Sequence, residues 1–333
     1  MKATTREILR CPRCRHERTL ELGSSSSDER EVREGTLTCS NCGQSYPVSE
    51  GIVDLLFEPP EFVLREAAGL ERFAEAMRND GWDRDRILAL PNVDLGYWYG
   101  QAVAMDALLD TVDLKPGQRL LDVGSNTCWA SNIFARRGLE VLALDIAKTE
   151  LQGLRTAEYF IGDGKVFFER ILSVMFDMPL ASESIDYVFC CEVLHHNDLE
   201  NLHRTMKEAY RVLRPGGLLL IINEPLRFPF NLKRDHAQEV AEYEGYEHVY
   251  FFHQYYLAAR RAGFRLSVEE PAPDWFFRPW KIELAPETTA AAGARALGAH
   301  LLRGSRLGRW LVLAYKTLLV GDVSLHMIAT KPG

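Results

Sequence analysis

The chain has 333 residues, of which 47% are hydrophobic and 26% are charged, a composition typical of ordinary globular proteins. This length exceeds the usual size of one domain and favours one large domain with appendages. The formal net charge of −8 argues against strong nonspecific binding to nucleic acid. Residues 1–10 lack the apolar core of a signal peptide, and the longest strongly apolar run, residues 310–320, is too short to span a bilayer. We therefore expect a cytoplasmic protein.

Four of the seven cysteines lie near the N-terminus as two C-x-x-C pairs, Cys11 with Cys14 and Cys39 with Cys42. Two such knuckles supply four thiolates for tetrahedral zinc, whereas a redox dithiol needs only one pair and disulfides are disfavoured in a reducing cytosol. We expect a structural Zn²⁺ that stabilises a segment too small to build an adequate core alone. The serine-rich segment Gly23–Asp28 between the pairs is predicted to be a hairpin tip.

The cysteine pairs read C-P-x-C and C-x-x-C-G, and the second is followed by YPVSEGIVDLL at residues 46–56. Together they resemble the small zinc-ribbon proteins that act as activator subunits of tRNA, rRNA and protein methyltransferases. The resemblance covers about residues 5–57. Such ribbons are fused directly to a methyltransferase in many bacterial chains, so the resemblance implies a zinc-ribbon domain over residues 1–58 and a methyltransferase after it.

Residues 59–110 are predicted to form a helical linker or cap. Pro59-Pro60 marks the linker, and the apolar residues after it recur at the spacing of a helix. The aromatic cluster at residues 97–99 precedes the last helix, and its side chains either line the site or pack against the sheet. The predicted helices cover Glu61–Arg78, Asp83–Leu90 and Gln101–Leu109.

Residues 119–145 have the pattern of half of a nucleotide-binding α/β unit. The apolar run Arg119–Val123 predicts a strand, the small residues after it a tight loop, and Trp129–Arg137 a helix that ends before a glycine. A second apolar run, Glu140–Leu144, predicts the next strand. It is closed by Asp145, which sits where the diol of a ribose needs a hydrogen-bond acceptor.

The loop after the first of these strands keeps only one glycine, Gly124, and continues with Ser125, Asn126, Thr127 and Cys128. A dinucleotide site needs G-x-G-x-x-G, so a pyrophosphate would be poorly held here. The pattern resembles instead the first motif of class I S-adenosylmethionine (SAM) methyltransferases. The resemblance places Asp122, Gly124 and Ser125 at the methionyl end of SAM and Asp145 at its ribose. The full predicted cofactor set is Asp122, Gly124, Ser125, Asn126, Asp145, Ile146, Met175, Asp177 and Glu192.

A second resemblance to SAM methyltransferases lies in RVLRPGG-LLLII at residues 211–222, which is similar to their stretch between the fourth and fifth strands. We therefore predict a Rossmann-like, seven-stranded, mostly parallel α/β sheet with helices on both faces, built from residues 111–333. The further predicted strands are Val166–Arg170, Ser184–Cys191, Leu218–Asn223, Phe264–Glu269 and an antiparallel closing strand Val323–Thr330; the further helices are Thr149–Tyr159, Leu202–Leu213 and Phe252–Ala262.

Two features distinguish the predicted site from the family pattern. The acid that usually accepts the adenine amino group is missing at residues 173–175, so backbone near Met175, or Asp177, would serve instead. His195 and His196 follow the fourth strand, where either could act as a general base or pack under the loop.

Two insertions are predicted, at about residues 224–254 and 272–321. The first is either a second metal site or a solvated acidic loop, and its candidate ligands are Glu242, Glu244, Glu247, His236 and His248. The apolar helix at 303–321 in the second is either a lid or a contact to a membrane or protein partner.

These patterns predict a SAM-dependent methyltransferase that acts on a small-molecule, glycan or lipid acceptor. Its rivals are an RNA methyltransferase and a catalytically degenerate scaffold. If the acceptor is RNA, we expect basic residues of the ribbon to contact it, namely Lys2, Arg6, Arg10, Arg13, Arg15 and Arg18.

Overall fold

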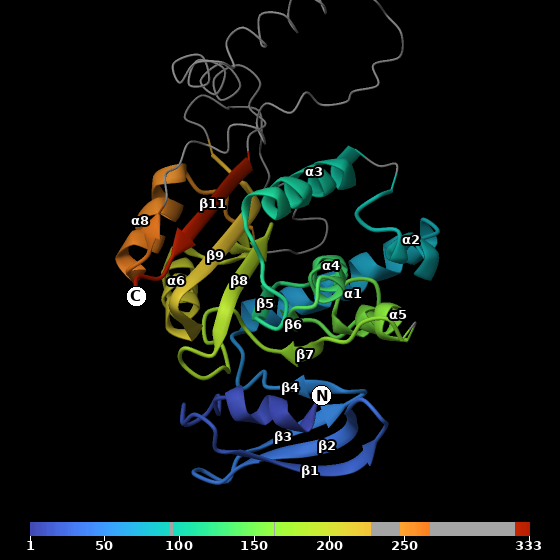
Figure 1. The fold of residues 1–333 in the computed structure, drawn as a ribbon. Helices are drawn as coiled ribbons and strands as arrows, with labels where there is room; N and C mark the ends of the chain where they lie inside the picture. The colour runs from blue at the N-terminus through green and yellow to red at the C-terminus, as the bar shows by residue number, and fades with distance from the viewer. Residues whose placement is uncertain (94–95, 163, 228–246, 267–323) are drawn as a thin grey trace, which may run out of the picture.

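The structure is a computed structural model that describes residues 1–93, 96–162, 164–227, 247–266 and 324–333 (Figure 1). Its eleven described strands form one sheet in the order β1-β2-β3-β4-β7-β6-β5-β8-β9-β11-β10. The N-terminal ribbon supplies the first four strands, and the α/β domain supplies the other seven. This sheet confirms the predicted fold class, but it has eleven strands where seven and a separate ribbon were expected.

The ribbon consists of a short 3-10 helix, η1 (Ala3–Ile8), and four strands paired antiparallel. Residues 23–27 of the serine-rich segment lie within the first strand, so the hairpin tip predicted for the whole segment is confined to its last residue, Asp28. Asp28 begins the turn, where its Oδ1 accepts from the amides of Arg30 and Glu31 at 2.8 and 2.9 Å. The ribbon strands are β1 (Leu20–Ser27), β2 (Val32–Cys39), β3 (Ser45–Ser49) and β4 (Ile52–Asp54).

The ribbon joins the α/β domain through a parallel pair of strands, β4 and β7 (Glu169–Leu172) (Figure 1). Val53 lies opposite Ile171 in this pair, and the amide of Leu55 extends it by donating to the carbonyl of Leu172 at 3.0 Å. Without the ribbon, β7 would be a sheet edge with unpaired backbone groups. The ribbon therefore continues the sheet of the α/β domain.

The strands next to this junction follow the order β7-β6-β5-β8-β9 and are all parallel. They are followed by β11, which is antiparallel to β9 as predicted. Several bounds differ from the predicted ones: β7 begins at Glu169, β9 already at Leu213, and β10 is described only as Arg265–Leu266. The remaining strands are β5 (Arg119–Val123), β6 (Glu140–Asp145), β8 (Ile185–Cys191), β9 (Leu213–Pro225) and β11 (Ser324–Thr330).

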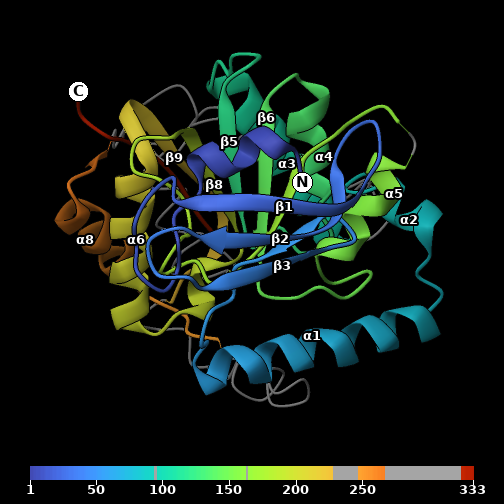
Figure 2. The same ribbon diagram turned by 90° about the horizontal axis from the view of Figure 1, so that it is seen from below.

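The helices lie on the two faces of the sheet (Figures 1 and 2). The segment predicted as helix 149–159 instead holds a 3-10 turn, η2 (Leu154–Thr156), followed by α5, and the aromatic cluster at 97–99 lies inside α3. The helices are α1 (Glu61–Asn79), α2 (Arg84–Leu88), α3 (Gly96–Thr111), α4 (Trp129–Arg136), α5 (Ala157–Ile161), α6 (Leu199–Val212) and α8 (Phe252–Ala262).

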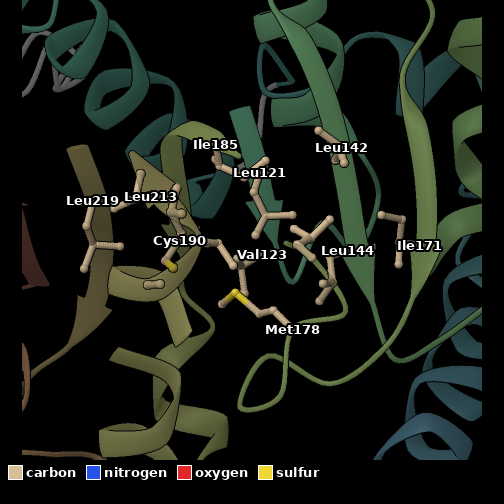
Figure 3. Close-up of a cluster of buried hydrophobic side chains, with 14 of the residues drawn as sticks. Leu121, Val123, Leu142, Leu144, Ile171, Met178, Ile185, Cys190, Leu213 and Leu219 are labelled. Carbon is tan, nitrogen blue, oxygen red and sulfur yellow. The ribbon is translucent and has the colours of Figure 1, made fainter. Parts of the chain in front are cut away.

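Alternating residues of the central strands feed two hydrophobic cores, as the period-2 geometry of a strand requires. Leu121 and Val123 of β5 belong to one core, shown in Figure 3, and Leu120 belongs to the other. The first core also contains ribbon residues such as Leu37 and Val53. Because full burial of such a side chain contributes roughly 1.5–3 kcal/mol, the shared core ties the ribbon firmly to the α/β domain.

Within the described part of the chain, no helix is long and apolar enough to cross a membrane. Residues 228–246 and 267–323 lie outside that part. The predictions for most of the first insertion and for all of the second, the helix at 303–321 included, therefore stay predictions.

Candidate active site

Most of the predicted cofactor residues lie at the carboxyl ends of the parallel strands, where three of these strands end in register. Val123, the last residue of β5, lies opposite Leu144 of β6 on one side and Cys190 of β8 on the other. The loops that follow these strands, residues 124–128, 146–153 and 192–198, therefore leave from neighbouring points. This is the edge at which open α/β sheets bind ligands.

Gly124 turns the chain at the end of β5 with φ of +69°, a conformation that favours glycine. A Cβ atom at this position would lie 2.2 Å from Val193 Cγ2. The amides of Gly124 and Ser125 both donate to the carbonyl of Leu144, at 2.8 and 3.1 Å. The loop after β5 is thus anchored to β6 and packed tightly against the loop after β8.

Asn126 and Cys128 stand where the methyltransferase pattern usually has glycine, and both adopt positive φ, at +44° and +57°. The Asn126 side chain donates to Gln152 Oε1 at 2.8 Å, and the Cys128 amide donates to the carbonyl of Ser125 at 2.7 Å. These contacts hold the left-handed backbone that glycine would adopt freely. The loop therefore keeps a glycine-like course with larger residues.

Asp145 ends β6 with its carboxylate held by two main-chain amides. Oδ2 accepts from Asn126 at 2.8 Å and Oδ1 accepts from Ala147 at 2.9 Å. Burial raises the pKa of Asp145 to about 6, although these amides oppose the shift. Each oxygen retains acceptor capacity, so the group can take hydrogen bonds from a diol.

Asp122 lies on β5 and is also buried. Its Oδ2 accepts from the Ser131 hydroxyl at 2.5 Å. Burial, with a smaller contribution from the charge of Asp145, raises the pKa of Asp122 to about 7. Neither carboxylate pairs with a lysine or arginine among the residues that the structure places. Two unpaired buried acids favour a ligand that carries positive charge and hydroxyl donors.

The loop also contains a buried polar atom that lacks a partner. Thr127 is 2% exposed, and its Oγ1 makes no hydrogen bond to any described residue. Buried polar atoms are normally hydrogen-bonded, so this hydroxyl is consistent with a ligand at the loop. The residues present therefore fit SAM, with its cationic methionyl end and its ribose diol.

His195 is held by Glu224, a fully buried residue near the end of β9. His195 Nδ1 lies 3.0 Å from Glu224 Oε2, while Oε1 accepts from the amides of Val193 and Leu194 at 2.6 and 2.8 Å. Burial opposes ionisation of Glu224, but His195 and these amides hold its pKa below the usual value. Glu224 therefore fixes both the histidine ring and the loop that carries it.

His196 faces α1, whose Glu66 lies with Oε1 2.5 Å from His196 Nδ1. Burial disfavours the imidazolium, but the Glu66 carboxylate outweighs burial and raises the pKa of His196 to about 9. A histidine that is protonated at neutral pH is a poor general base. The predicted catalytic role of His195 and His196 stays a prediction, and the geometry favours His195 over His196.

The other predicted cofactor residues occupy flanking positions. Ile146 directly follows Asp145 and is half-buried, and Met175 Sδ accepts from Asn197 Nδ2 at 3.1 Å. Glu192 follows β8 with φ of +48° and accepts a hydrogen bond from the Tyr97 hydroxyl of α3. Burial raises the pKa of Glu192.

Asp177 is placed differently from the prediction. Its Oδ1 lies 2.6 Å from Arg10 Nη2 and its Oδ2 lies 2.8 Å from Arg15 Nη2, so both oxygens face ribbon arginines. The predicted cofactor role of Asp177 is therefore unsupported, since an interdomain ion pair uses its carboxylate. The same contacts weaken the proposed RNA face, because Arg10 is only 7% exposed and also pairs with Glu208.

Sequence reasoning missed the polar groups that reach the site from other elements. Gln101 Oε1 of α3 accepts from Asn223 Nδ2 at 2.7 Å and from Cys191 Sγ at 3.0 Å, which links α3 to β9 and β8. Asn223 and Glu224 could have been found as the polar pair that ends an apolar strand. Glu66 could not have been found in this way, because in the sequence it is one of several acidic residues of an amphipathic helix.

The ribbon brings its four cysteines together at one end. Cys11 Sγ lies 3.7 Å from Cys42 Sγ, and Cys14 Sγ lies 3.7 Å from Cys39 Sγ. All four sulfur atoms lie within 4.8 Å of one another. These distances exclude disulfides and match the spacing of about 3.8 Å that tetrahedral zinc with bonds of about 2.3 Å imposes on sulfur. The cysteines therefore fit a zinc ion.

Comparison with known families agrees with this geometry. Residues 121–221 match the family described as a methyltransferase domain, and residues 2–51 match the Trm112p-like proteins. The chain carries a methyltransferase domain behind a Trm112p-like domain. The first match runs from β5 into β9 and includes His195 and His196. The second match includes all four ribbon cysteines.

Two curated relatives resemble the methyltransferase domain. A malonyl-[acyl-carrier protein] O-methyltransferase of Serratia marcescens is 32% identical over 119 residues, which cover 34% of this chain and 42% of the relative. The ubiquinone/menaquinone biosynthesis C-methyltransferase UbiE of Cereibacter sphaeroides is 32% identical over 124 residues, covering 35% of this chain and 46% of the relative. The chain thus spans less than half the length of each.

Among solved structures, one chain of a Haloferax volcanii complex between the Trm112 methyltransferase activator and a methyltransferase is similar to this chain. The identity is 16% and the TM-score 0.47, and the match covers 81% of this chain and 98% of the other.

Proposed function

We propose that this protein is a SAM-dependent methyltransferase that acts on a small-molecule, glycan or lipid acceptor. The observation that carries the proposal is the Asp145 carboxylate, which the amides of Asn126 and Ala147 hold at the end of β6. An acid so placed binds a ribose diol. The match of residues 121–221 to methyltransferase domains supports the same cofactor.

The surrounding residues would hold SAM along the sheet edge. Asp145 would accept from the ribose hydroxyls, and Asp122, Gly124 and Ser125 would lie at the cationic methionyl end. SAM supplies an electrophilic methyl group when bound. The residues of the chain then have to bind the acceptor with its nucleophile in line with that methyl, which lowers the barrier mainly through orientation. His195, positioned by Glu224, would take a proton where the acceptor carries one.

Three observations favour an acceptor other than RNA. The chain has a net charge of −8, and two of the six basic residues predicted to contact RNA, Arg10 and Arg15, pair with Asp177. The two curated relatives are named for an acyl-carrier substrate and for quinone biosynthesis. The Trm112p-like domain keeps RNA as the rival. Turnover that is insensitive to salt supports the small acceptor, whereas affinity that falls steeply with salt supports RNA.

Calorimetric titration of the zinc-loaded protein with SAM and S-adenosylhomocysteine tests the cofactor. Wild type is expected to bind at micromolar concentration, and Asp145→Asn to bind at least tenfold more weakly, about 1.4 kcal/mol. Asp113→Asn, at an exposed acid remote from the site, is the matched control. If the wild type does not bind SAM at millimolar concentration, the proposal of an enzyme is wrong and the protein is a catalytically degenerate scaffold.

A further inference from the structure

Two adjacent histidines and a glutamate gather beyond the carboxyl end of β8. His195, His196 and Glu247 each present one ligand atom, and these atoms lie within 4.8 Å of one another. The two imidazole rings lie 4.3 Å apart, centroid to centroid. Glu247 comes from a segment about fifty residues further along the chain, so the cluster depends on tertiary structure. Glu247 lies outside both of the family matches.

Each histidine of this cluster has a carboxylate beside its ring. His195 Nδ1 lies 3.0 Å from Glu224 Oε2, and His196 Nδ1 lies 2.5 Å from Glu66 Oε1. Histidines that bind metals almost always have such an outer carboxylate or carbonyl partner, which fixes the ring and strengthens the ligand. Both histidines of this cluster therefore have the outer partner that a metal-binding histidine needs.

The position of Glu247 is fixed by main-chain contacts on its C-terminal side. The amide of His248 donates to the carbonyl of His195 at 2.7 Å, and the Tyr250 hydroxyl donates to the carbonyl of Asn197 at 2.6 Å. The amide of Arg227 in turn donates to the carbonyl of Tyr250 at 2.8 Å. Glu247 is therefore delivered to the histidines by a segment that is hydrogen-bonded to the same loop.

An incompletely satisfied nitrogen points to a ligand at this cluster. His196 Nδ1 is buried and makes no hydrogen bond of good geometry within the described residues, although Glu66 Oε1 lies 2.5 Å away as an ion-pair partner. With Glu66 as the outer partner at Nδ1, Nε2 is the nitrogen left to bind an ion, and binding would displace the proton that the ring otherwise carries.

We propose that His195, His196 and Glu247 bind a divalent transition-metal ion, with Glu224 and Glu66 as the outer partners of the two histidines. Two imidazoles and one carboxylate suit Zn²⁺, Mn²⁺, Fe²⁺ or Co²⁺, whereas Mg²⁺ and Ca²⁺ prefer oxygen ligands alone. Three protein ligands leave coordination positions open. On the proposed function, an oxygen of the acceptor would bind there beside the methyl donor, and the ion would then replace His195 as the group that favours loss of the acceptor's proton; this role alone rests on that proposal.

The test measures metal binding without SAM, so its result is independent of methyl transfer. The full-length protein is stripped of metal, loaded with one equivalent of Zn²⁺ for the ribbon cysteines, and titrated with Co²⁺. The second ion is expected to bind at micromolar concentration. Its Co²⁺ spectrum should show the weak visible absorption of nitrogen and oxygen ligands and lack the charge-transfer band that thiolate ligands give. Mass spectrometry with inductively coupled plasma then counts two ions per chain.

Glu247→Gln is the main variant, because Glu247 is exposed and its replacement is expected to leave the fold intact. It is expected to weaken the second site at least tenfold, as is His196→Gln, while the ribbon keeps its Zn²⁺. Glu200→Gln, at an exposed acid of α6, is the matched control and is expected to bind two ions. A wild type that binds only the ribbon ion overturns the proposal, as does a second ion whose affinity Glu247→Gln and His196→Gln leave unchanged.

Discussion

The carboxylate of Asp145 accepts a hydrogen bond from the main-chain amide of Asn126 at 2.8 Å, which ties the end of β6 to the loop after β5. This one contact orients the acid and also holds Asn126 at its positive φ. The acceptor and the loop are therefore arranged before any ligand arrives. A site prepared in this way loses less conformational entropy on binding.

The pKa of Asp145 makes cofactor affinity depend on pH. Because burial raises this pKa to about 6, the carboxyl is ionised above pH 6 and protonated below it. A ribose diol donates to the ionised form, so affinity is present above pH 6 and is lost as pH falls through that value. Between pH 7.5 and pH 5, S-adenosylhomocysteine is expected to bind about tenfold more weakly, as follows from a single group of this pKa.

Calorimetry over this pH range checks the prediction, with Asp145→Asn as the decisive variant. The component of the pH profile centred near 6 should disappear in that variant. Asp122, whose pKa is raised to about 7, titrates nearby, so Asp122→Asn is measured in parallel. A profile near pH 6 that survives in Asp145→Asn would show that another group is responsible.

Gly124→Ala is expected to weaken SAM binding at least tenfold, about 1.4 kcal/mol. The new methyl group would lie 2.2 Å from Val193 Cγ2 at a backbone φ of +69°, so the loop has to move. Gly117→Ala is the matched control, since Gly117 has a similar φ of +79° with nothing within 4 Å of its Cβ position. The double variant Gly124→Ala/Val193→Ala should recover part of the affinity in calorimetry. Wild-type affinity in Gly124→Ala would show that the loop does not touch the cofactor.

The features that the sequence predicts well are those encoded by local spacing. Two C-x-x-C pairs are sufficient to predict a four-cysteine cluster, and the sulfur atoms do converge. The strand, loop, helix and strand at residues 119–145 were likewise predictable, because periodicity and the closing Asp145 lie within one short segment. The mostly parallel sheet with an antiparallel closing strand followed from the resemblance to methyltransferases, and the structure confirms it.

The features that the sequence did not predict depend on contacts between distant segments. Nothing in residues 52–54 indicates a parallel partner at 170–172, since pairing of short apolar strands is set by the free edge that β7 offers. Asp177 was assigned to the cofactor because of its position after the third strand, but its carboxylate pairs with Arg10 and Arg15 of the ribbon. Glu66 reaches His196 from a helix whose pattern indicates only amphipathicity.

A buried ion pair joins the ribbon to the methyltransferase domain. Arg170 of β7 is fully buried, and its guanidinium contacts Glu31 of the ribbon and Glu158 of α5. Removing one partner of a buried pair typically costs about 3–5 kcal/mol where it leaves the other charge unpaired. Glu31 keeps its ion pairs with the N-terminal amine and with Arg33, each at 2.8 Å, so Arg170→Ala is expected to lower the free energy of unfolding by less, about 1–3 kcal/mol, measured by urea denaturation.

A double-mutant cycle with Glu31→Ala tests whether the loss arises from the pair. The two single changes should sum to more than the double change, because each single change already breaks the contact between Arg170 and Glu31. Arg65→Ala, at an arginine that is 62% exposed, is the control and should change stability by less than about 0.5 kcal/mol. Additive effects of Arg170→Ala and Glu31→Ala would contradict the coupling.

Loss of zinc is expected to destabilise the methyltransferase domain as well as the ribbon, because β4 and β7 share one sheet and the ribbon side chains share one core. Cys14→Ser removes a single thiolate and leaves the histidine cluster intact. We expect zinc affinity to fall at least tenfold, which weakens the metal-linked stability by about 1.4 kcal/mol or more.

Urea denaturation followed by tryptophan fluorescence distinguishes coupled from independent unfolding, since all six tryptophans lie outside the ribbon. In Cys14→Ser the transition reported by these tryptophans should move to lower urea and remain a single step. A tryptophan transition unchanged from wild type, together with separate early loss of the ribbon, would show that the two domains unfold independently. In that case the parallel pairing of β4 with β7 would hold the ribbon in place without stabilising the methyltransferase domain.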